Sequence, residues 1–207
     1  MNKTTKAWEK IFQKDGKVFF DPHEDMHMIT QILNKQGAKR ILDLGSGSGR
    51  HVIYFLKEGF SVFGLDNSPA GIAMTKKWLQ KEGLSAELTK QEMTDRFPWN
   101  NNFFDVVISI QVIHHADTIT IKKIISEIER VLKKNGFIFI TVPKLKNQGE
   151  NFEQIERNTF IPLDGYEKGL PHHYFTPQEW KDYFSNFKIK DIHIDERDHY
   201  CLTANKL

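Results

Sequence analysis

The sequence predicts an α/β fold with a doubly wound, mostly parallel sheet. Three patterns support this fold class. A short apolar run at 41–44 leads into a glycine-rich turn and then a helical pattern, which together are half of a βαβ unit. The strongest strand pattern, at 103–110, is followed by a helical apolar stripe at 121–132. Alternating segments at 188–195 and 199–205 predict an antiparallel hairpin.

Length and composition are typical of one globular domain. Of the 207 residues, 39% are hydrophobic and 12% aromatic, which suffices for a full core. The net charge of +2 disfavours nucleic acid as a partner, and the single cysteine, Cys201, fits a reducing cytosol. The polar start predicts no signal peptide, and no apolar run reaches the roughly 18 residues of a membrane span. We therefore expect a cytoplasmic protein.

The first predicted element is an amphipathic helix. Residues 1–17 carry lysines at roughly helical spacing, with Trp8 and Phe12 between them. Two interpretations fit this pattern. The helix either presents a solvated lysine face or acts as a lid whose Trp8 and Phe12 close over a substrate.

A second helix is predicted to begin at Asp21 and Pro22, a cap residue followed by proline. Its buried face is expected to hold Met26, Ile29 and Leu33, with Gly37 at its end. It contains the pattern H-E-x-x-H at His23, Glu24 and His27, which on a helix can bind zinc. No third ligand stands in a recognisable context, so we expect surface residues here and predict no metal site. A zinc peptidase stays open only as a minor alternative.

The glycine-rich turn at 45–49 suits close contact with a ligand. Glycine has no Cβ, so it can adopt φ > 0 and let another molecule lie against the backbone. The dinucleotide fingerprint requires glycine at position 50, where this chain has Arg50. The stretch resembles the first motif of class I S-adenosylmethionine-dependent methyltransferases, D-x-G-x-G-x-G. The matching residues are Asp43, Gly45, Gly47 and Gly49.

The resemblance implies a Rossmann-like sheet of seven strands that ends in an antiparallel C-terminal strand. It also implies that S-adenosylmethionine is the cofactor and S-adenosylhomocysteine the product. A carboxylate at the strand end suits a ligand with an ammonium and a sulfonium, whereas it would repel a pyrophosphate. The implied cofactor contacts in this motif are Asp43, Gly45, Ser46, Gly47 and Gly49.

A second carboxylate follows the next predicted strand, at 61–65. Asp66 lies about 20 residues after the first glycine, where it can accept hydrogen bonds from both ribose hydroxyls of an adenosine. The alternative is that Asp66 only helps to cap the following helix, which Ser68 starts and Gly83 ends. We expect Asn67 to contact the cofactor as well.

Two further cofactor contacts follow from the resemblance. After a short third strand at 86–88, Glu92 would bind the adenine amine and Met93 would pack on its ring. Plain core packing is an equally good interpretation of Met93. After the fourth strand, the backbone at Ile110 and Gln111 would face the methionine part.

The next helix is predicted to run from Ile121 to the turn at 135–136, with a fifth strand at 137–142. The run at 127–136 resembles the family's E-x-x-R-V-L-K-P-G-G. Residues 144–175 lack periodicity, which is typical of a functional loop, and we expect them to cap the substrate. The single domain therefore divides into N-terminal capping helices (1–37), a cofactor-binding core (38–143), a substrate-capping insertion (144–175), and a C-terminal helix with hairpin (176–207).

Methyl transfer needs positioning and a base for the incoming atom, and histidine is the natural base near neutral pH. We predict His115 and His173 as catalytic residues. His114, His172 and Tyr174 are further candidates for substrate contact.

The methyl acceptor is predicted to be a small molecule, with a protein side chain as the second choice. The motif N/D-P-P-Y, expected for amino methylation of adenine or glutamine amide, does not follow the fourth strand. Cys201 lies in the last strand, away from the predicted site. A nicotinamide-dependent reductase would need a Tyr-x-x-x-Lys pair, which the chain lacks. A non-catalytic S-adenosylmethionine-binding module stays open as an alternative.

Overall fold

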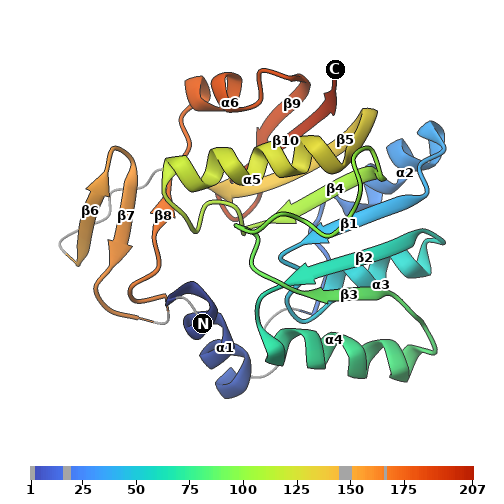
Figure 1. Cartoon of the computed structure of the whole chain (residues 1–207), viewed down its shortest axis with the longest axis horizontal. Coiled ribbons are helices and arrows are strands. Elements are labelled where there is room, and N and C mark those ends of the chain that lie inside the picture. Colours follow the sequence, from blue (N-terminus) through green and yellow to red (C-terminus); the bar gives the residue numbers. More distant parts are fainter. Residues whose placement is uncertain (1–2, 16–19, 145–150, 166) are drawn as a thin grey trace.

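The computed structural model describes residues 3–15, 20–144, 151–165 and 167–207. Its main element is a seven-stranded sheet with strand order β3-β2-β1-β4-β5-β10-β9 (Figure 1). The first five strands are parallel, and β10 runs antiparallel to both β5 and β9. This topology confirms the predicted fold class. The strands are β1 (Arg40–Leu44), β2 (Ser61–Asp66), β3 (Glu87–Lys90), β4 (Phe104–Ile110), β5 (Leu132–Pro143), β9 (Phe187–Ile194) and β10 (His199–Lys206).

Helices cover both faces of the sheet, because successive residues of a strand point to opposite sides. In β1, Ile41 packs in the core beneath α2, α3 and α4, whereas Leu42 and Leu44 pack in the core beneath α5 and α6. Both cores are apolar and almost fully buried, so each helix is held by its apolar stripe. The helices are α2 (Met26–Gln36), α3 (Arg50–Lys57), α4 (Pro69–Glu82), α5 (Thr118–Val131) and α6 (Pro177–Tyr183).

Two helix starts agree with their cap residues, and one does not. The Ser68 side chain accepts a hydrogen bond from Gly71 N at the start of α4, and Thr176 forms a full capping box at the start of α6. The predicted start of α2 at Asp21 is wrong. Local hydrogen bonds from Asp25 N and Met26 N to His23 form a turn instead, and α2 begins at Met26.

The boundary between α5 and β5 lies earlier than predicted. The helix ends at Val131, and Leu132 already adopts an extended conformation and pairs with Phe104 of β4. The sequence pattern could not show this, because burying Leu132 against a distant strand decides the boundary. The turn at Asn135 survives inside the strand, where Asn135 has a φ of 60°.

The insertion predicted to lack regular structure contains a second, three-stranded antiparallel sheet. It consists of β6 (Phe152–Glu156), β7 (Thr159–Pro162) and β8 (His172–His173). The prediction of a structureless segment is therefore wrong for its described residues, and residues 145–150 and 166 lie outside them. His173 N donates to His114 O at 2.8 Å, so β8 lies against the segment that follows β4.

The first helix, α1 (Lys3–Asp15), packs beside α4 near the carboxyl ends of the parallel strands (Figure 1). Residues 1, 2, 16 and 17 of the predicted helix lie outside the described part of the chain. Within the described residues, the helices are all too short or too polar to span a membrane.

Candidate active site

A cavity of about 480 Å³ lies at the carboxyl ends of the parallel strands, next to the point where the strand order reverses between β1 and β4. Open α/β sheets bind their ligands at this edge. One end of the cavity, here called the loop side, is lined by residues 45–48 and Asp66, and Asp43 of β1 lies just before this turn in the chain. The other end, the histidine side, comprises His114, His115 and His172.

The turn on the loop side requires glycine for backbone and space alike. Gly45, Gly47 and Gly49 have φ angles of 79°, 51° and 89°. A Cβ added to Gly45 would lie 2.4 Å from Val112 Cγ2, and one added to Gly49 would lie 2.6 Å from Thr75 Cγ2. The loop therefore brings bare backbone to the cavity wall.

The two strand-end carboxylates differ in how they are satisfied. Asp66 accepts hydrogen bonds from Gly47 N at 2.7 Å and Ser68 N at 2.8 Å. Burial raises its pKa, and these backbone N–H groups oppose the rise. The Asp43 atom Oδ2 is buried without a hydrogen-bond partner among the described residues. Burial raises the pKa of Asp43 to about 7, with Arg50 opposing and Asp66 adding to the rise.

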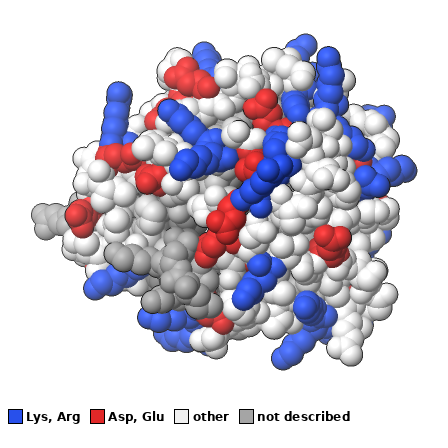
Figure 2. Space-filling view, in the orientation of Figure 1, with Lys and Arg blue, Asp and Glu red and all other residues white. Residues whose placement is uncertain are grey.

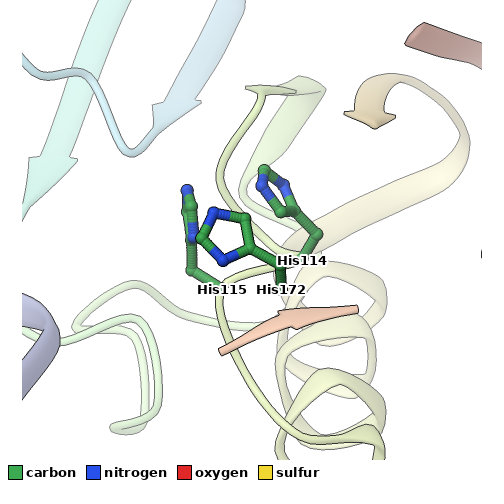
Figure 3. Close-up of side chains that lie close together, drawn as sticks. All are labelled: His114, His115 and His172. Carbon is green, nitrogen blue, oxygen red and sulfur yellow. The ribbon is translucent and has the colours of Figure 1, made fainter. Parts of the chain in front are cut away.

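The histidine side consists of three buried rings that point toward one another (Figure 3). The ring centroids lie 3.9 Å apart for His114 and His115, and 4.7 Å apart for His115 and His172. His114 and His115 follow β4, and His172 lies in β8. Burial lowers the pKa of His114 far below its usual value and that of His115 to about 3, and the neighbouring His172 lowers both further.

His172 is fixed by two hydrogen-bond acceptors. Its Nδ1 lies 3.0 Å from Leu170 O, and its Nε2 lies 3.0 Å from Glu167 Oε2. The bond to His172 lowers the pKa of Glu167 although burial opposes this, so that carboxylate is ionised at neutral pH. The histidine side thus carries a negative charge at its edge.

Helix α1 forms the outer wall of the cavity. Trp8 and Phe12 line it, and the Trp8 ring meets the His115 ring edge-on at a centroid distance of 5.7 Å. Glu9 fastens the helix to the start of α4, because its Oε2 accepts from Ser68 Oγ at 2.6 Å and Ala70 N at 2.9 Å. Of the two interpretations of α1, this placement supports the lid.

The comparisons with known proteins agree with this geometry. Residues 42–140 match the family described as a methyltransferase domain. The match covers just under half of the chain and identifies this part as a methyltransferase domain. An uncharacterized methyltransferase of Bacillus subtilis is 24% identical over 65% of this chain and 52% of its own length. Human EEF1A lysine methyltransferase 2 is 26% identical over 74% of this chain and 75% of its own length.

Solved structures share the methyltransferase fold. A SAM-dependent methyltransferase from Methanosarcina mazei has a TM-score of 0.76 at 21% identity, covering 91% of this chain and 99% of its own. A Burkholderia thailandensis N-methyltransferase with bound S-adenosylhomocysteine has a TM-score of 0.71 at 18% identity, covering 97% and 88%. The chain spans about half the length of two bacterial relatives, the Bacillus subtilis protein and a putative methyltransferase of Geobacillus.

The cofactor of the methyltransferase domain is S-adenosylmethionine, and the residues present fit it. Asp43 Oδ2 and Ser46 Oγ are buried polar atoms without a hydrogen-bond partner among the described residues. Both lie at the glycine turn, whose wall no Cβ can occupy at Gly45. A ligand with donors and a positive charge would satisfy these atoms.

Most of the predicted cofactor residues of the methyltransferase domain line the cavity. They are Gly45, Ser46, Gly47, Asp66, Asn67, Met93, Ile110 and Gln111. Asp43, Gly49 and Glu92 lie behind this wall; Glu92 Oε2 accepts a hydrogen bond from Asn67 Nδ2 at 2.9 Å. Gln111 has a φ of 60°, a strained conformation held by its N–H donating to Thr141 O at 3.0 Å.

The predicted catalytic histidines do not all reach the cavity. His114, His115, His172 and Tyr174 line it. His173 points away, because its ring is fully buried with Nδ1 2.8 Å from Thr159 Oγ1 and Nε2 3.4 Å from Glu179 Oε1. The structure therefore joins His115 with His172, and it separates both from the His173 side chain.

The predicted H-E-x-x-H pair does not form. His23 precedes α2, and its Nε2 lies 3.1 Å from Asp195 Oδ2. His27 is exposed and bonds Gln31 Nε2 at 3.0 Å. Because α2 begins at Met26, the two histidines do not share a helix face, and the zinc-peptidase hypothesis loses its ligand pair.

Several cavity residues were not found from the sequence. Arg50 directly follows the glycine turn, and this position could have predicted that it lines the cavity. Glu167, Arg197 and His199 also line the cavity. His199 begins β10, and Arg197 lies in the turn before it. The pairing of β10 with β5 places both residues at the cavity, which no local sequence pattern predicts.

Proposed function

We propose that this protein transfers a methyl group from S-adenosylmethionine to a small-molecule acceptor held on the histidine side. The observation that carries the proposal is the cavity itself. Helix α1 covers it near the glycine turn, and β8 bounds it on the histidine side. Its volume of about 480 Å³ lies in the range of small-molecule sites.

The loop side has the groups that the cofactor needs. Asp66 keeps unused lone pairs after bonding Gly47 N and Ser68 N, so it can accept from ribose hydroxyls. Asp43 lies where a carboxylate can attract the ammonium group of the methionine part. Met93 offers an apolar surface for the adenine ring, with Asn67 and Glu92 beside it.

The histidine side is where we place the acceptor. When bound, the cofactor supplies an electrophilic methyl group on a sulfonium, so the chain has only to orient the acceptor and exclude water. Trp8 and Tyr174 are suited to exclude water because they line the cavity beside His115. His115 Nδ1 has no hydrogen-bond partner among the described residues and is free to contact the acceptor.

A protein acceptor is the second candidate, because a relative of similar length is named a lysine methyltransferase. The surface offers this candidate little support. Figure 2 shows basic and acidic side chains interspersed over the face in view, without a field of one sign. A protein acceptor would therefore have to insert a single side chain past α1.

The proposal is tested with the purified chain and tritiated S-adenosylmethionine. Calorimetry first measures S-adenosylhomocysteine affinity for the natural chain, for Asp66→Ala, and for the control Asp105→Ala. Asp105 lies at the amino end of β4, whereas the cavity lies at the carboxyl ends of the strands. Transfer of tritium is then followed to a panel of small metabolites and, separately, to a protein extract. We expect Asp66→Ala alone to lose cofactor affinity and label to enter small molecules. Label confined to protein would contradict the proposed acceptor, and cofactor binding without any transfer would favour the non-catalytic module.

A further inference from the structure

Three imidazole rings meet on the histidine side in an arrangement that methyl transfer alone does not explain. One nitrogen of each of His114, His115 and His172 lies within 4.8 Å of the corresponding nitrogen of the other two. All three residues are buried, and they come from two segments that only the folded chain brings together (Figure 3). Three buried imidazole rings therefore share one small space, with the Glu167 carboxylate at its edge.

The tautomer of His115 leaves such a lone pair available. Its ring bonds the backbone of Pro171, and proline offers only a carbonyl, so the ring nitrogen there is a donor. Nδ1 has no hydrogen-bond partner among the described residues, so the donor is Nε2 and Nδ1 carries the lone pair. His114 Nδ1 is likewise buried without a partner in the described chain. Buried ring nitrogens without a partner are costly unless a ligand or an ion meets them.

His172 presents its Nε2 in the same way. Leu170 O can only accept, so Nδ1 carries a proton, which fixes the ring as backbone carbonyls fix metal-bound histidines. Nε2 then faces the ionised carboxylate of Glu167 at 3.0 Å. Two acceptors can face each other at this distance only with a cation or a proton between them. This corner of the cavity is built for positive charge.

A metal ion binds the unprotonated nitrogen of an imidazole ring. His115 Nδ1 offers such a nitrogen without a hydrogen-bond partner among the described residues. One nitrogen of each of the three rings lies within 4.8 Å of the others, so the geometry of the cluster suits a metal ion.

We propose that His114, His115 and His172 bind a divalent transition-metal ion of the zinc class on the histidine side of the cavity. Three imidazole ligands with one position left open are typical of zinc sites that act on a bound molecule. With Zn–N distances of about 2.1 Å, tetrahedral ligand atoms lie about 3.4 Å apart, so the rings need only small rotations to close in. The site departs from the expectation, drawn from the sequence, that no metal is bound.

The ion also narrows the acceptor, a step that depends on the proposed function. A zinc-class ion with an open position binds an acceptor through oxygen or sulfur and lowers the pKa of that group. The acceptor would then release its proton to solvent and attack the sulfonium methyl as an anion, without a protein base. Its oxygen or sulfur would form the bond to the methyl carbon while the sulfonium–methyl bond breaks, and neutral S-adenosylhomocysteine would leave. This favours hydroxyl or thiol acceptors over amines.

Two other groups of potential ligands exist among the described residues, and both include Cys201. They are His23 with Asp195, and Asp25 with His193. Burial raises the pKa of the Cys201 thiol well above its usual range, so it resists the deprotonation that binding requires. Asp195 already accepts from His199 N at 2.8 Å and Arg197 N at 3.0 Å. His193 Nε2 likewise lies 3.0 Å from Asp25 Oδ2. In the three-histidine group, by contrast, Nδ1 of both His114 and His115 is buried without a hydrogen-bond partner among the described residues.

The test is a titration of the metal-free full chain with Co²⁺, followed by competition with Zn²⁺. Tetrahedral Co²⁺ has visible absorption bands that report its ligands, and the measurement needs neither cofactor nor acceptor. The variants are His115→Ala and His172→Gln, the second of which keeps a donor toward Glu167. Cys201→Ser and His27→Ala are the controls, since His27 is exposed on α2. S-Adenosylhomocysteine affinity, measured in chelator, shows that each variant is folded.

We expect one equivalent of Co²⁺ with a tetrahedral spectrum in the natural chain and in both controls. His115→Ala and His172→Gln should bind the ion more weakly by about 100-fold or more while keeping cofactor affinity. Failure of the natural chain to bind one equivalent, or loss of binding in Cys201→Ser instead, would overturn the proposal. Absence of S-adenosylhomocysteine binding by the natural chain would instead overturn the proposed function, and the metal titration would still be interpretable.

Discussion

The two ends of the cavity bury ionisable groups of opposite kinds. On the loop side, Asp43 and Asp66 are carboxyl groups whose pKa values are raised by burial. On the histidine side, His114 and His115 are imidazoles whose pKa values are lowered by burial. In each case burial disfavours the charged form of the side chain. On the loop side, a cationic ligand would stabilise the ionised carboxylates. On the histidine side, a cation would bind the neutral imidazoles that burial already favours.

The difference has opposite consequences for stability. Folding makes Asp43 bind its proton more tightly, so the free energy of unfolding falls as the pH rises from 3.8 to about 7. Folding makes His115 release its proton, so the free energy of unfolding rises as the pH rises from about 3 to 6.5. The two slopes oppose each other, and single substitutions should separate them.

The largest effect is expected for Asp43→Asn. Removing a carboxyl group that must ionise while buried should raise the free energy of unfolding at pH 8 by about 4 kcal/mol, from the three-unit rise in pKa. S-Adenosylhomocysteine affinity should fall at the same time, by about tenfold or more, because the ammonium loses its partner. Urea unfolding between pH 4 and 8 measures the first effect and calorimetry the second.

Asp105→Asn is the control for this substitution. Burial raises the pKa of Asp105, but bonds from Lys133, Arg40 N and Lys39 N outweigh burial and lower it. Its substitution should therefore destabilise the chain at pH 8. If the free energy of unfolding changed by the same amount and in the same direction in both variants, the conclusion that ionised Asp43 destabilises the fold would be contradicted.

The next largest effect is expected for Gly45→Ala. Its Cβ would lie 2.4 Å from Val112 Cγ2 in a left-handed backbone, so both the turn and the start of the histidine side must move. We expect a loss of about 3 kcal/mol in stability and a severe loss of cofactor affinity. Gly59→Ala is matched in φ, at 87°, but its Cβ meets nothing within 4 Å, so it should cost about 1 kcal/mol. Similar costs at both positions would show that backbone conformation alone matters.

His115→Gln tests the histidine side in the absence of metal. At pH 5, which is below the usual histidine pKa, a buried neutral His115 lowers the free energy of unfolding by about 2 kcal/mol. At pH 8 it has no such effect. The variant should be more stable than the natural chain at pH 5 by about this amount, with unchanged cofactor affinity. A stability difference independent of pH would mean that His115 is charged in the folded protein.

The smallest effect is expected for Glu9→Gln, which touches both ends through α1. The substitution removes the negative charge of the acceptor and so weakens the hydrogen bonds from Ser68 Oγ and Ala70 N. We expect this to lower stability by about 1 kcal/mol. We expect faster amide exchange in α1 and a cofactor affinity lower by about threefold. Gln13→Ala removes only the exposed bond within α1 and should leave both quantities unchanged.

The loop side could be predicted from the sequence because its parts are local. Asp43 and the glycines lie within seven consecutive positions, and Asp66 ends the next strand, so strand geometry alone brings them together. Eight of the predicted cofactor residues line the cavity as a result. The exceptions, Asp43, Gly49 and Glu92, lie one layer behind it, which a motif cannot show.

The histidine side could be predicted only as separate residues. His114 and His172 meet because β8 pairs with β7 and because His173 N bonds His114 O, contacts between distant segments. From the sequence, His173 ranks before His172 as a catalytic candidate, yet neighbouring residues in a strand point in opposite directions. Only strand pairing decides which of the two faces the cavity.

Closure of the cavity by α1 has a consequence for the timing of each reaction cycle. Glu9 holds that helix at Ser68, which also caps α4. The bond between Glu9 and Ser68 must therefore break each time the cofactor enters or its product leaves. We therefore expect departure of the spent cofactor, instead of bond making, to limit turnover. Steady-state rates would then respond to solvent viscosity.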